Sequence, residues 1–481
     1  MRLLSTTMAL SGALLLVSPA NAATLADWEN CTGKDIVVII GGCTKIVEDT
    51  AQSAKSRSTA YFHRGNAHEE KGDNERALSD FSEAIKLDPA YAEAYAHRAS
   101  IYFDMADYDR AIADLDELMR HLKPDAETLT KRADAYRAKG DTDRAIADYN
   151  SALALTPNHV AALYNRANSY YDREELDKSL QDYNETIKRD PRHAQAYSGR
   201  ANIYLLRRDF SQAIAEYSAA IDIEPEFAYA YNGRAGAYFQ TGDMDSAIAD
   251  YTEALRFDPK YTEALNGRGT TYYEKGDLDK SIADFDDVIR LNPQFTNAYN
   301  NRGNAYAKKG DNTRALDDFG EAIRLNPGDA APYFDRGRVY FMGLRDYTKA
   351  HAEFMQGYEL NANYGYFPLW LHMSERRANR DSRLETYLSQ VDMDAWPAPL
   401  IKLFQGALTP AQAQAAAEDN DPVRKKDQLC EYNFYAAELA LMQDNKDEAI
   451  RLFKLAANEC SKSFIELDAA QAELKQLGVT P

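Results

Sequence analysis

Hydrophobic and polar positions along this chain recur with a period of 34 residues. The period is clearest at an arginine that is followed each time by glycine or alanine. We number the positions of each repeat from 1, beginning at Ser58, so that this arginine is position 7. The nine arginines at position 7 are Arg64, Arg98, Arg132, Arg166, Arg200, Arg234, Arg268, Arg302 and Arg336. A fixed period of this length predicts an array of stacked repeats and not several separate globular domains.

The apolar positions within a repeat predict two antiparallel helices. Apolar and aromatic residues at positions 4, 8 and 11 share one face of a first helix, and those at positions 20, 24 and 27 share one face of a second. Gly-Asp pairs such as Gly72-Asp73 are typical of the end of one helix and the start of the next. A proline near the end of each of the first eight repeats stops the second helix. The bulky residues at position 24 are Phe81, Leu115, Tyr149, Tyr183, Tyr217, Tyr251, Phe285 and Phe319.

One helix pair of this kind does not bury both of its faces, so the repeats must stack on one another. The length of the repeat, the order of its small, aromatic and proline positions, and its ninefold recurrence resemble the tetratricopeptide repeat (TPR) family. The resemblance covers Ser58 to about Tyr364 and implies an all-α superhelical solenoid of about nine repeats with an inner groove. The ninth repeat departs from the pattern, because Ala350 and Phe354 arrive one residue late, after Gly343. We expect a local distortion there.

Four cysteines lie outside the array, two before it and two after it. Cys31 and Cys43 stand 34 residues before Gly65 and Ala77, which occupy the positions where the two helices of a repeat pack most closely. A degenerate repeat before Ser58 therefore brings these two sulfur atoms within bonding reach. We predict a disulfide between Cys31 and Cys43 that ties an N-terminal cap.

Cys430 and Cys460 bracket a further predicted helix pair, over 431–442 and 446–458. The start of one antiparallel helix lies beside the end of the next, so we predict a second disulfide between these two cysteines. Four cysteines allow three pairings, and the spacing favours this one. Metal ligation is the alternative, but the sequence has no CxxC unit and no nearby histidine cluster.

After Tyr364 the sequence changes character. The segments 369–371 (LWL), 396–399 (WPAP) and 431–435 (EYNFY) resemble the C-terminal part of the family of the periplasmic lipoprotein NlpI. That resemblance implies a cell-envelope adaptor that brings proteases and peptidoglycan-remodelling enzymes together. This chain departs from that family because it has more repeats and no cysteine directly after its predicted cleavage site.

The first residues predict a secretory signal peptide. A positive start, the apolar run 3–17 and the small-x-small sequence 20–22 are the parts of a cleavable signal. We expect a bacterial protein that is periplasmic or secreted; the alternative is an N-terminal anchor that stays attached. The predicted organisation is a signal peptide (1–22), a degenerate capping repeat (23–57), the TPR array (58–364) and a C-terminal helical domain with a further TPR-like helix pair (365–481).

Charge and motifs argue against nucleic acid and against catalysis. The 56 lysines and arginines stand against 76 acidic residues, and the net charge of −20 disfavours a phosphate backbone or an anionic membrane as the main partner. No GxSxG, P-loop or GxGxxG motif occurs, and the His-Glu pair at His68 lacks the second histidine of a zinc-protease helix. We expect no enzyme activity, no cofactor and no metal site. A hydrolase hidden in the C-terminal segment is the least favoured alternative.

An acidic residue at position 23 accompanies each arginine at position 7. We predict that the arginine pairs with this carboxylate across the two helices of its repeat, which makes a structural ladder along the array. The predicted ladder includes Arg166, Arg200, Arg234, Arg268, Arg302, Asp182, Asp250 and Asp284. The alternative is an anion-binding stripe on the inner wall.

We expect binding on the inner wall of the groove, which positions 2, 5, 6, 9, 12 and 13 of the first helices form. Asparagines recur there at positions 5 and 9, and aromatic residues recur at position 12. Asparagine amides bond a peptide backbone in both directions and aromatic rings contact its side chains, although asparagine is also a tolerated polar residue on a solvated face. The predicted partner-binding residues are Asn168, Asn202, Asn232, Asn266, Asn300, Asn304, Tyr171, Phe239 and Tyr273.

The sequence thus predicts a non-catalytic scaffold or adaptor that binds a protein or an extended peptide in the groove, with a role in cell-envelope maintenance. The alternative function is a component of exopolysaccharide synthesis or export that binds glycan, or a secretion partner, through the aromatic rings at position 12.

Overall fold

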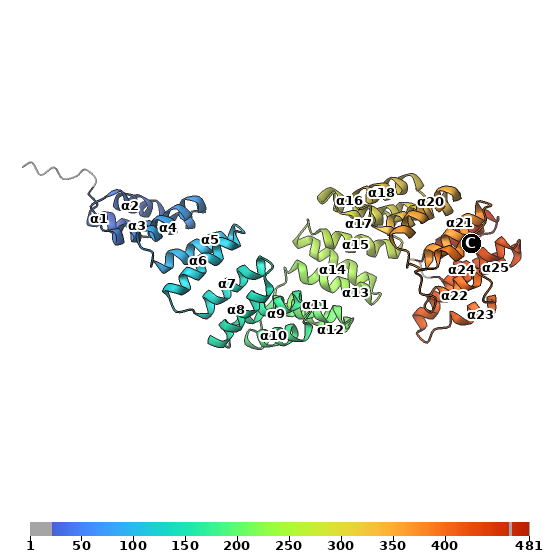
Figure 1. Ribbon diagram of the computed structural model, residues 1–481, viewed down its shortest axis with the longest axis horizontal. Helices are drawn as coiled ribbons and strands as arrows, with labels where there is room; N and C mark the ends of the chain where they lie inside the picture. The colour runs from blue at the N-terminus through green and yellow to red at the C-terminus, as the bar shows by residue number, and fades with distance from the viewer. Residues whose placement is uncertain (1–21, 461–463, 481) are drawn as a thin grey trace, which may run out of the picture. The chain divides into compact units, whose positions relative to one another are not determined.

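The computed structural model of the protein describes residues 22–460 and 464–480, so the predicted signal peptide lies outside the described residues except for Ala22. Within these ranges every regular element is a helix, which confirms the predicted all-α class (Figure 1). No helix in the described part of the chain combines the length and the apolar character needed to cross a membrane. The chain divides into two compact units, one ending at Ile203 and the other beginning at Tyr204.

Both units are stacks of antiparallel helix pairs, in which each helix packs against the next one along the chain. The helices of the first unit are α1 (Leu25–Cys31), α2 (Ile36–Glu48), α3 (Ala54–Glu70), α4 (Asn74–Leu87), α5 (Ala92–Asp104), α6 (Tyr108–His121), α7 (Ala126–Ala138), α8 (Thr142–Leu155), α9 (Val160–Asp172) and α10 (Leu176–Arg189). Helix α11 (Ala194–Leu206) contains the boundary between the units.

The second unit continues the repeats and adds a C-terminal group of helices. Its repeat helices are α12 (Phe210–Ile223), α13 (Ala228–Gln240), α14 (Met244–Phe257), α15 (Thr262–Lys275), α16 (Leu278–Leu291), α17 (Thr296–Lys308), α18 (Asn312–Leu325), α19 (Ala330–Arg338), the π-helix η1 (Val339–Gly343) and α20 (Tyr347–Leu360). The elements that follow are α21 (Tyr366–Arg377), η2 (Leu384–Tyr387), α22 (Ala398–Phe404), α23 (Pro410–Ala416), α24 (Pro422–Met442), α25 (Lys446–Glu459) and α26 (Ile465–Gln476).

The turn between the two helices of a repeat follows the Gly-Asp prediction. Gly72 has a φ of +77°, in the left-handed region that favours glycine, and it ends the first helix of its repeat. The Asp73 side chain then accepts a hydrogen bond from the backbone N–H of Arg76 and caps the second helix. In the next repeat Ala106 takes the same left-handed conformation, with a φ of 59°.

The small residue at position 8 and the bulky residue at position 24 are packed against each other. A Cβ atom added to Gly65 lies 2.7 Å from the ring of Phe81, so a larger side chain does not fit there. The rings also reach the first helix of the following repeat, because a Cβ added to Gly233 lies 2.3 Å from the ring of Tyr217. Position 24 therefore joins one repeat to the next.

The ninth repeat contains the expected distortion. Its first helix changes into the π-helix η1 at Val339, which ends at Gly343. A π-helical turn holds one residue more than an α-helical turn, so it accommodates the extra residue that delays Ala350 and Phe354. Both of these side chains are fully buried despite the shift.

Two disulfides confirm the predicted pairing of the cysteines. Cys31, at the end of α1, is bonded to Cys43 in α2, with their Cα atoms 4.6 Å apart. Cys430 in α24 is bonded to Cys460, directly after α25, with a Cα–Cα distance of 5.0 Å. No cysteine in the described residues is left free.

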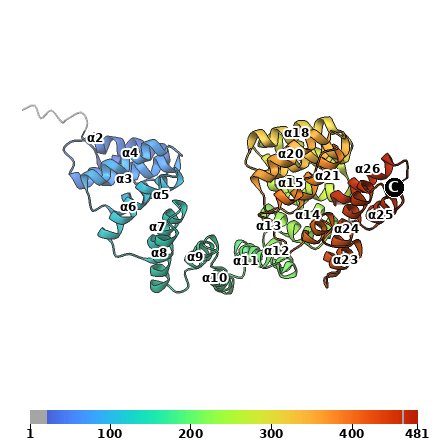
Figure 2. The same cartoon turned by 45° about the vertical axis from the view of Figure 1, so that its right-hand side comes forward.

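One hydrophobic core runs from the ninth repeat into the C-terminal helices. Phe334 and Phe354 of the repeat belong to the same buried cluster as Trp370 of α21 and Phe434 of α24. Helix α26 completes this core with Ala469 and other residues, and it packs on both α24 and α25 (Figure 2). The core thus continues across the predicted domain boundary after residue 364.

Candidate functional site

The position 7 arginines form forked ion pairs within their own repeats. Nε and Nη2 of Arg234 donate to the two carboxylate oxygens of Asp250, at 2.7 and 2.9 Å. Both side chains are largely buried, with exposed fractions of 19% and 10%. The same fork joins Arg64 to Asp80, Arg98 to Asp114, Arg132 to Asp148, Arg166 to Asp182, Arg268 to Asp284 and Arg302 to Asp318. In the ninth repeat Arg336 donates to Glu353 at 2.8 Å.

In the second to eighth repeats a third bond of the arginine reaches the preceding repeat, and sequence reasoning missed it. Nη1 of Arg234 donates to the hydroxyl of Ser218 at 2.9 Å. Ser218 is position 25 of the repeat before, which carries a polar residue in seven of the first eight repeats. The equivalent bonds run from Arg98 to Ser82, Arg132 to Asp116, Arg166 to Asn150, Arg200 to Asn184, Arg268 to Thr252 and Arg302 to Asp286.

These bonds show what the arginine ladder does in the folded chain. Two nitrogens of the guanidinium bind a buried carboxylate, and the third binds the neighbouring repeat. No bidentate edge of the guanidinium is then left for an external anion. The geometry supports the structural role of the ladder over an anion-binding stripe.

The predicted asparagines of the last repeats are paired along the inner wall. Nδ2 of Asn300 and Nδ2 of Asn304 both donate to Oδ2 of Asp335, at 3.0 and 2.9 Å. Oδ1 of Asn266 accepts a hydrogen bond from Asn301 at 3.3 Å. These amides link the first helices of neighbouring repeats. Part of their hydrogen-bonding capacity is therefore used within the inner wall and not for a partner.

The other predicted asparagines lie half-buried on the same face of their helices. Oδ1 of Asn168 accepts a hydrogen bond from the hydroxyl of Tyr183 at 2.5 Å. Asn202 lies in α11 and Asn232 in α13, both half-buried. The structure therefore places the predicted asparagines on the wall but shows that several of them orient their neighbours.

The predicted aromatic residues at position 12 are half-buried against the helix cores. Tyr171 packs on the cluster around Tyr183, and Phe239 packs on the cluster around Tyr251. The ammonium of Lys308 lies 5.0 Å from the centre of the Tyr273 ring.

The C-terminal helix α26 lies along the inner wall of the last repeats. Arg345, after the ninth repeat's first helix, forms an ion pair with Glu473 and donates to the backbone carbonyl of Ala472 at 3.3 Å. Lys308, at position 13 of the eighth repeat, lies 3.8 Å from the carboxylate of Asp468. Helix α26 thus closes one side of the groove, a contact that the repeat pattern did not predict.

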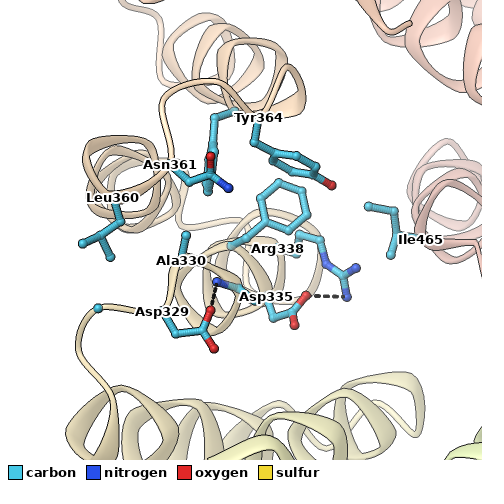
Figure 3. A pocket seen from close by; sticks show the side chains of 12 residues that line it. Asp329, Ala330, Asp335, Arg338, Leu360, Asn361, Tyr364 and Ile465 are labelled. Atoms are coloured by element: carbon cyan, nitrogen blue, oxygen red, sulfur yellow. Dashed lines mark hydrogen bonds and ion pairs between the residues drawn. The ribbon is translucent and has the colours of Figure 1, made fainter. Parts of the chain in front are cut away.

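A pocket of about 590 Å³ opens between α19 and α21, with Ile465 of α26 at its edge. Its aromatic walls are Phe334, Tyr364 and Phe367. Figure 3 shows Ile465 reaching from its separate helix toward Arg338 and Tyr364. The pocket thus uses inner-wall positions of the ninth repeat.

Polar groups converge on the same pocket. Arg338 lies 3.6 Å from Asp335 and donates to Oδ1 of Asn304 at 3.3 Å, while its buried Nε has no hydrogen-bond partner. Asn361 and Asp329 line the opposite part, and Asp329 caps α19 through the backbone N–H of Ala331 (Figure 3). The pocket offers both donors and acceptors beside its rings.

A smaller pocket of about 240 Å³ adjoins the first, because Arg338 and Ile465 line both. Its walls include the predicted groove residues Tyr273 and Asn304. Sequence reasoning missed Arg338, although it is the only basic residue at position 9 in the array. The two pockets are neighbouring parts of one groove on the inner wall of the second unit.

Two carboxyl groups of the C-terminal helices are buried. Glu431 accepts hydrogen bonds from the hydroxyl of Tyr366 and from Nε1 of Trp396, both at 2.7 Å. Glu466, next to Ile465, accepts from the hydroxyl of Tyr435 at 3.4 Å. Burial raises the pKa of both carboxyl groups, and in Glu466 the charge of Glu431 raises it further. Glu466 thus bonds α26 to α24, and Glu431 bonds α24 to α21 and to Trp396.

The histidines and acidic residues do not assemble a metal site in residues 22–460 and 464–480, where no three His, Cys, Asp or Glu side chains converge suitably. His97 instead binds a single carboxylate, that of Glu69, at 2.8 Å. His68 lies within the helix core, 4.0 Å from Asp80.

Models of one repeat family match the chain over just over half of its length, and each of them describes the TPR repeat. The matched segments are 65–105, 133–172 and 269–310 for a TPR repeat model, and 164–226, 198–262, 296–329 and 92–120 for three tetratricopeptide repeat models.

Parts of this chain are similar to solved structures, two of which are described as TPR proteins. A tetratricopeptide repeat protein from Parabacteroides merdae is 21% identical, with 52% of this chain and 98% of that chain covered and a TM-score of 0.42. YrrB, described as a TPR protein with an unusual peptide-binding site, is 22% identical over 38% of this chain and 95% of its own, with a TM-score of 0.34. MamA is 26% identical over 33% of this chain and 93% of its own, with a TM-score of 0.31. With the period, the helix pairs and the family models in agreement, the chain belongs to the tetratricopeptide repeat proteins.

Proposed function

We propose that this protein is a non-catalytic adaptor that binds an extended segment of another protein on the inner wall of its repeats. The observation that carries the proposal is the groove between the ninth repeat, α21 and α26. Its pocket of about 590 Å³ combines aromatic walls with the polar groups of Arg338, Asp329 and Asn361. Binding sites for protein segments and small ligands are typically apolar hollows with a few convergent polar groups.

The chemistry of the groove suits a peptide in two ways. The rings of Phe334 and Tyr364 offer flat apolar contact area for a side chain. Asn361 and Arg338 offer donors, and Asp329 offers an acceptor, for the N–H and C=O groups that an extended main chain presents.

We further propose that the protein works in the periplasm or outside the cell. Two disulfides are stable in an oxidising compartment, and the predicted signal peptide directs a chain there. The resemblance of the segment after 364 to the NlpI family stays a prediction, and it motivates a role in cell-envelope maintenance.

A photo-crosslinking experiment tests the groove in living cells. A photo-reactive phenylalanine derivative at Ala331, an exposed residue that lines the pocket, is compared with the same group at Ala283, an exposed residue on α16 away from it. We expect a partner protein to be crosslinked from Ala331 and not from Ala283. Equal crosslinking from both positions, or none from either, contradicts the proposal.

The second candidate function is glycan binding in exopolysaccharide synthesis or export. One observation favours it: Tyr364 keeps 40% of its surface exposed at the edge of the pocket, as a ring that stacks on a sugar does. Material captured by the purified protein distinguishes the two. A protein partner is lost when the extract is treated with protease, whereas a glycan partner is retained.

A further inference from the structure

The second repeat lacks the ring that the other repeats place at position 24. Eight repeats carry a phenylalanine or tyrosine there, counting Phe354 in the shifted ninth repeat, and the second carries Leu115. In the third and fourth repeats this ring extends from the second helix to position 9 of the first helix. The hydroxyl of Tyr149 donates to Asp134 and that of Tyr183 donates to Asn168, both at 2.5 Å and both at position 9.

The missing ring leaves a hollow of about 210 Å³ on the inner wall of the first unit. Leu115 of α6 lines it together with Ala96, Ser100 and Phe103 of α5. Alanine and serine are small, so they keep the space above Leu115 open. A water molecule takes about 30 Å³ of liquid volume, and the hollow therefore has room for a branched aliphatic side chain.

Two charged side chains of α7 stand at the rim of the hollow. Lys131 is exposed, and its ammonium lies 3.4 Å from the carboxylate of Glu127. Asp134 is half-buried and accepts hydrogen bonds from Tyr149 and from Nδ2 of Asn165, the latter at 2.9 Å. The apolar interior and the polar rim together suit one apolar side chain of a chain segment whose backbone passes over the rim.

The charge of the surrounding inner wall indicates the charge of the segment that fits the hollow. Among the inner-wall positions of α3, α5, α7 and α9, seven residues are acidic and two are basic. The acidic residues are Glu69, Glu70, Glu93, Asp104, Glu127, Asp134 and Asp172, and the basic residues are Lys131 and Arg137. An acidic wall attracts a basic partner and disfavours an acidic one.

We propose that the hollow beside Leu115 binds a leucine-sized aliphatic side chain of an extended, lysine- or arginine-rich protein segment. This second site extends the proposed peptide-binding function to the first unit. All of its residues precede Ile203, in the first unit. A failed test of this site therefore leaves the proposal for the pocket beside Arg338 unaffected, and the reverse also holds.

The test uses fluorescence anisotropy with three labelled peptides and the full chain. The first peptide places one leucine between alternating lysines and serines, the second replaces that leucine with alanine, and the third replaces the lysines with glutamates. We expect the leucine peptide to bind about tenfold more tightly than the alanine peptide, since burial of a leucine side chain is worth about 1.5 kcal/mol or more. The glutamate peptide should not bind measurably.

Two variants fill the hollow from opposite sides. Leu115→Tyr introduces the ring that other repeats hold at this position, and Ser100→Leu fills the hollow from its exposed mouth. We expect both to keep the helical circular dichroism of the wild type and to reduce the preference for leucine to less than twofold. Ala283→Tyr, at an exposed residue of α16 that lines neither binding pocket, serves as the matched control and should leave the preference unchanged.

Three outcomes overturn the proposal. The first is a folded filling variant that keeps the tenfold preference. The second is tight binding of the glutamate peptide. The third is a dimer in sedimentation that Ser100→Leu dissociates, because the occupant is then a second copy of this chain and not a basic segment.

Discussion

At the scale of single residues, the arginine at position 7 joins the two helices of its repeat and, in the second to eighth repeats, also contacts the repeat before it. Arg234 binds Asp250 within its repeat and Ser218 in the repeat before. Its guanidinium also lies 5.6 Å from the centre of the Tyr231 ring. One side chain thus sets both the angle within a helix pair and the contact between pairs.

Replacement of Arg234 by methionine tests this role. We expect Arg234→Met to destabilise the surrounding repeats by about 3 kcal/mol, because it leaves the largely buried Asp250 without its counter-charge. Hydrogen exchange of α13 and α14 and thermal melting measure the loss. Arg256→Met is the control, since Arg256 pairs with Glu253 on the surface with 60% and 42% of the two side chains exposed. Unchanged melting together with lost partner binding supports the anion-binding stripe instead.

Glu466 makes stability depend on pH. Its pKa is raised by burial, so the folded chain holds this proton at pH values where the unfolded chain has released it. The contribution of Glu466 is therefore most favourable at acidic pH, and it weakens as the pH rises from the ordinary glutamate range through the raised pKa. We expect Glu466→Gln to melt at a higher temperature than the wild type at pH 8, with a smaller difference at pH 5.

Glu473 is the matched control for this titration. It lies on the same helix and is equally buried, but it is ion-paired with Arg345 and Arg377. Glu473→Gln removes that pairing, so it should lower the melting temperature at pH 8. A pH-independent effect of Glu466→Gln contradicts the titration argument.

At the scale of elements, disulfides stabilise the two ends of the chain's helical stack. The repeats in the middle are stabilised by packing against the repeats on either side. Among the residues that the structure describes, helices α1 and α2 pack on one neighbouring pair, and the bond between Cys31 and Cys43 ties them together. At the other end, the bond between Cys430 and Cys460 joins α24 to the end of α25. A terminal repeat buries less surface than an internal one, so a crosslink contributes most there.

Removal of the first bond should loosen the cap selectively. In the Cys31→Ser/Cys43→Ser variant we expect a loss of about 3 kcal/mol from the cap, the value for a closed loop of this length. Amides of α1 and α2 should exchange faster, while those of α13 to α16 should not change. Mass spectrometry of the unreduced wild type checks the pairing, and a peptide that joins Cys31 to Cys430 or Cys460 contradicts it.

At the scale of the whole second unit, the C-terminal helix decides the shape of the groove. Helix α26 packs into the core with Leu474 and reaches the inner wall with Ile465. Arg345 connects it to the ninth repeat through Glu473. The groove is therefore made by the repeats and the C-terminal helix together.

Arg345→Met tests how firmly α26 is held on the wall. We expect amide exchange in α26 to speed up about tenfold, because the variant removes one of the two cations that face Glu473. Crosslinking from Ala331 should weaken as well, since Ile465 no longer stays at the edge of the pocket. Arg451→Met, which breaks an exposed pair with Glu448 on α25, is the control and should change neither.

The sequence by itself determined the helix pairs, the arginine forks and the disulfides. Each of these contacts joins residues at a fixed and short separation, such as 16 for Arg234 and Asp250 and 12 for Cys31 and Cys43. A period repeats such a separation many times, so the pattern of residue types reveals the contact. The extra residue in the ninth repeat predicted a local distortion, and the structure shows that this distortion is a π-helix over Val339–Gly343.

Only the tertiary structure decided which helix borders the groove and where its wall contains a hollow. Arg345 and Glu473 are 128 residues apart, and no period relates them. The pairing of Asn300 and Asn304 with Asp335, and the hollow above Leu115, depend on which side chains from neighbouring helices meet. Local separations fix the repeat, whereas the docking of α26 follows from how all the helices of the unit bury their apolar faces, which a linear pattern does not contain.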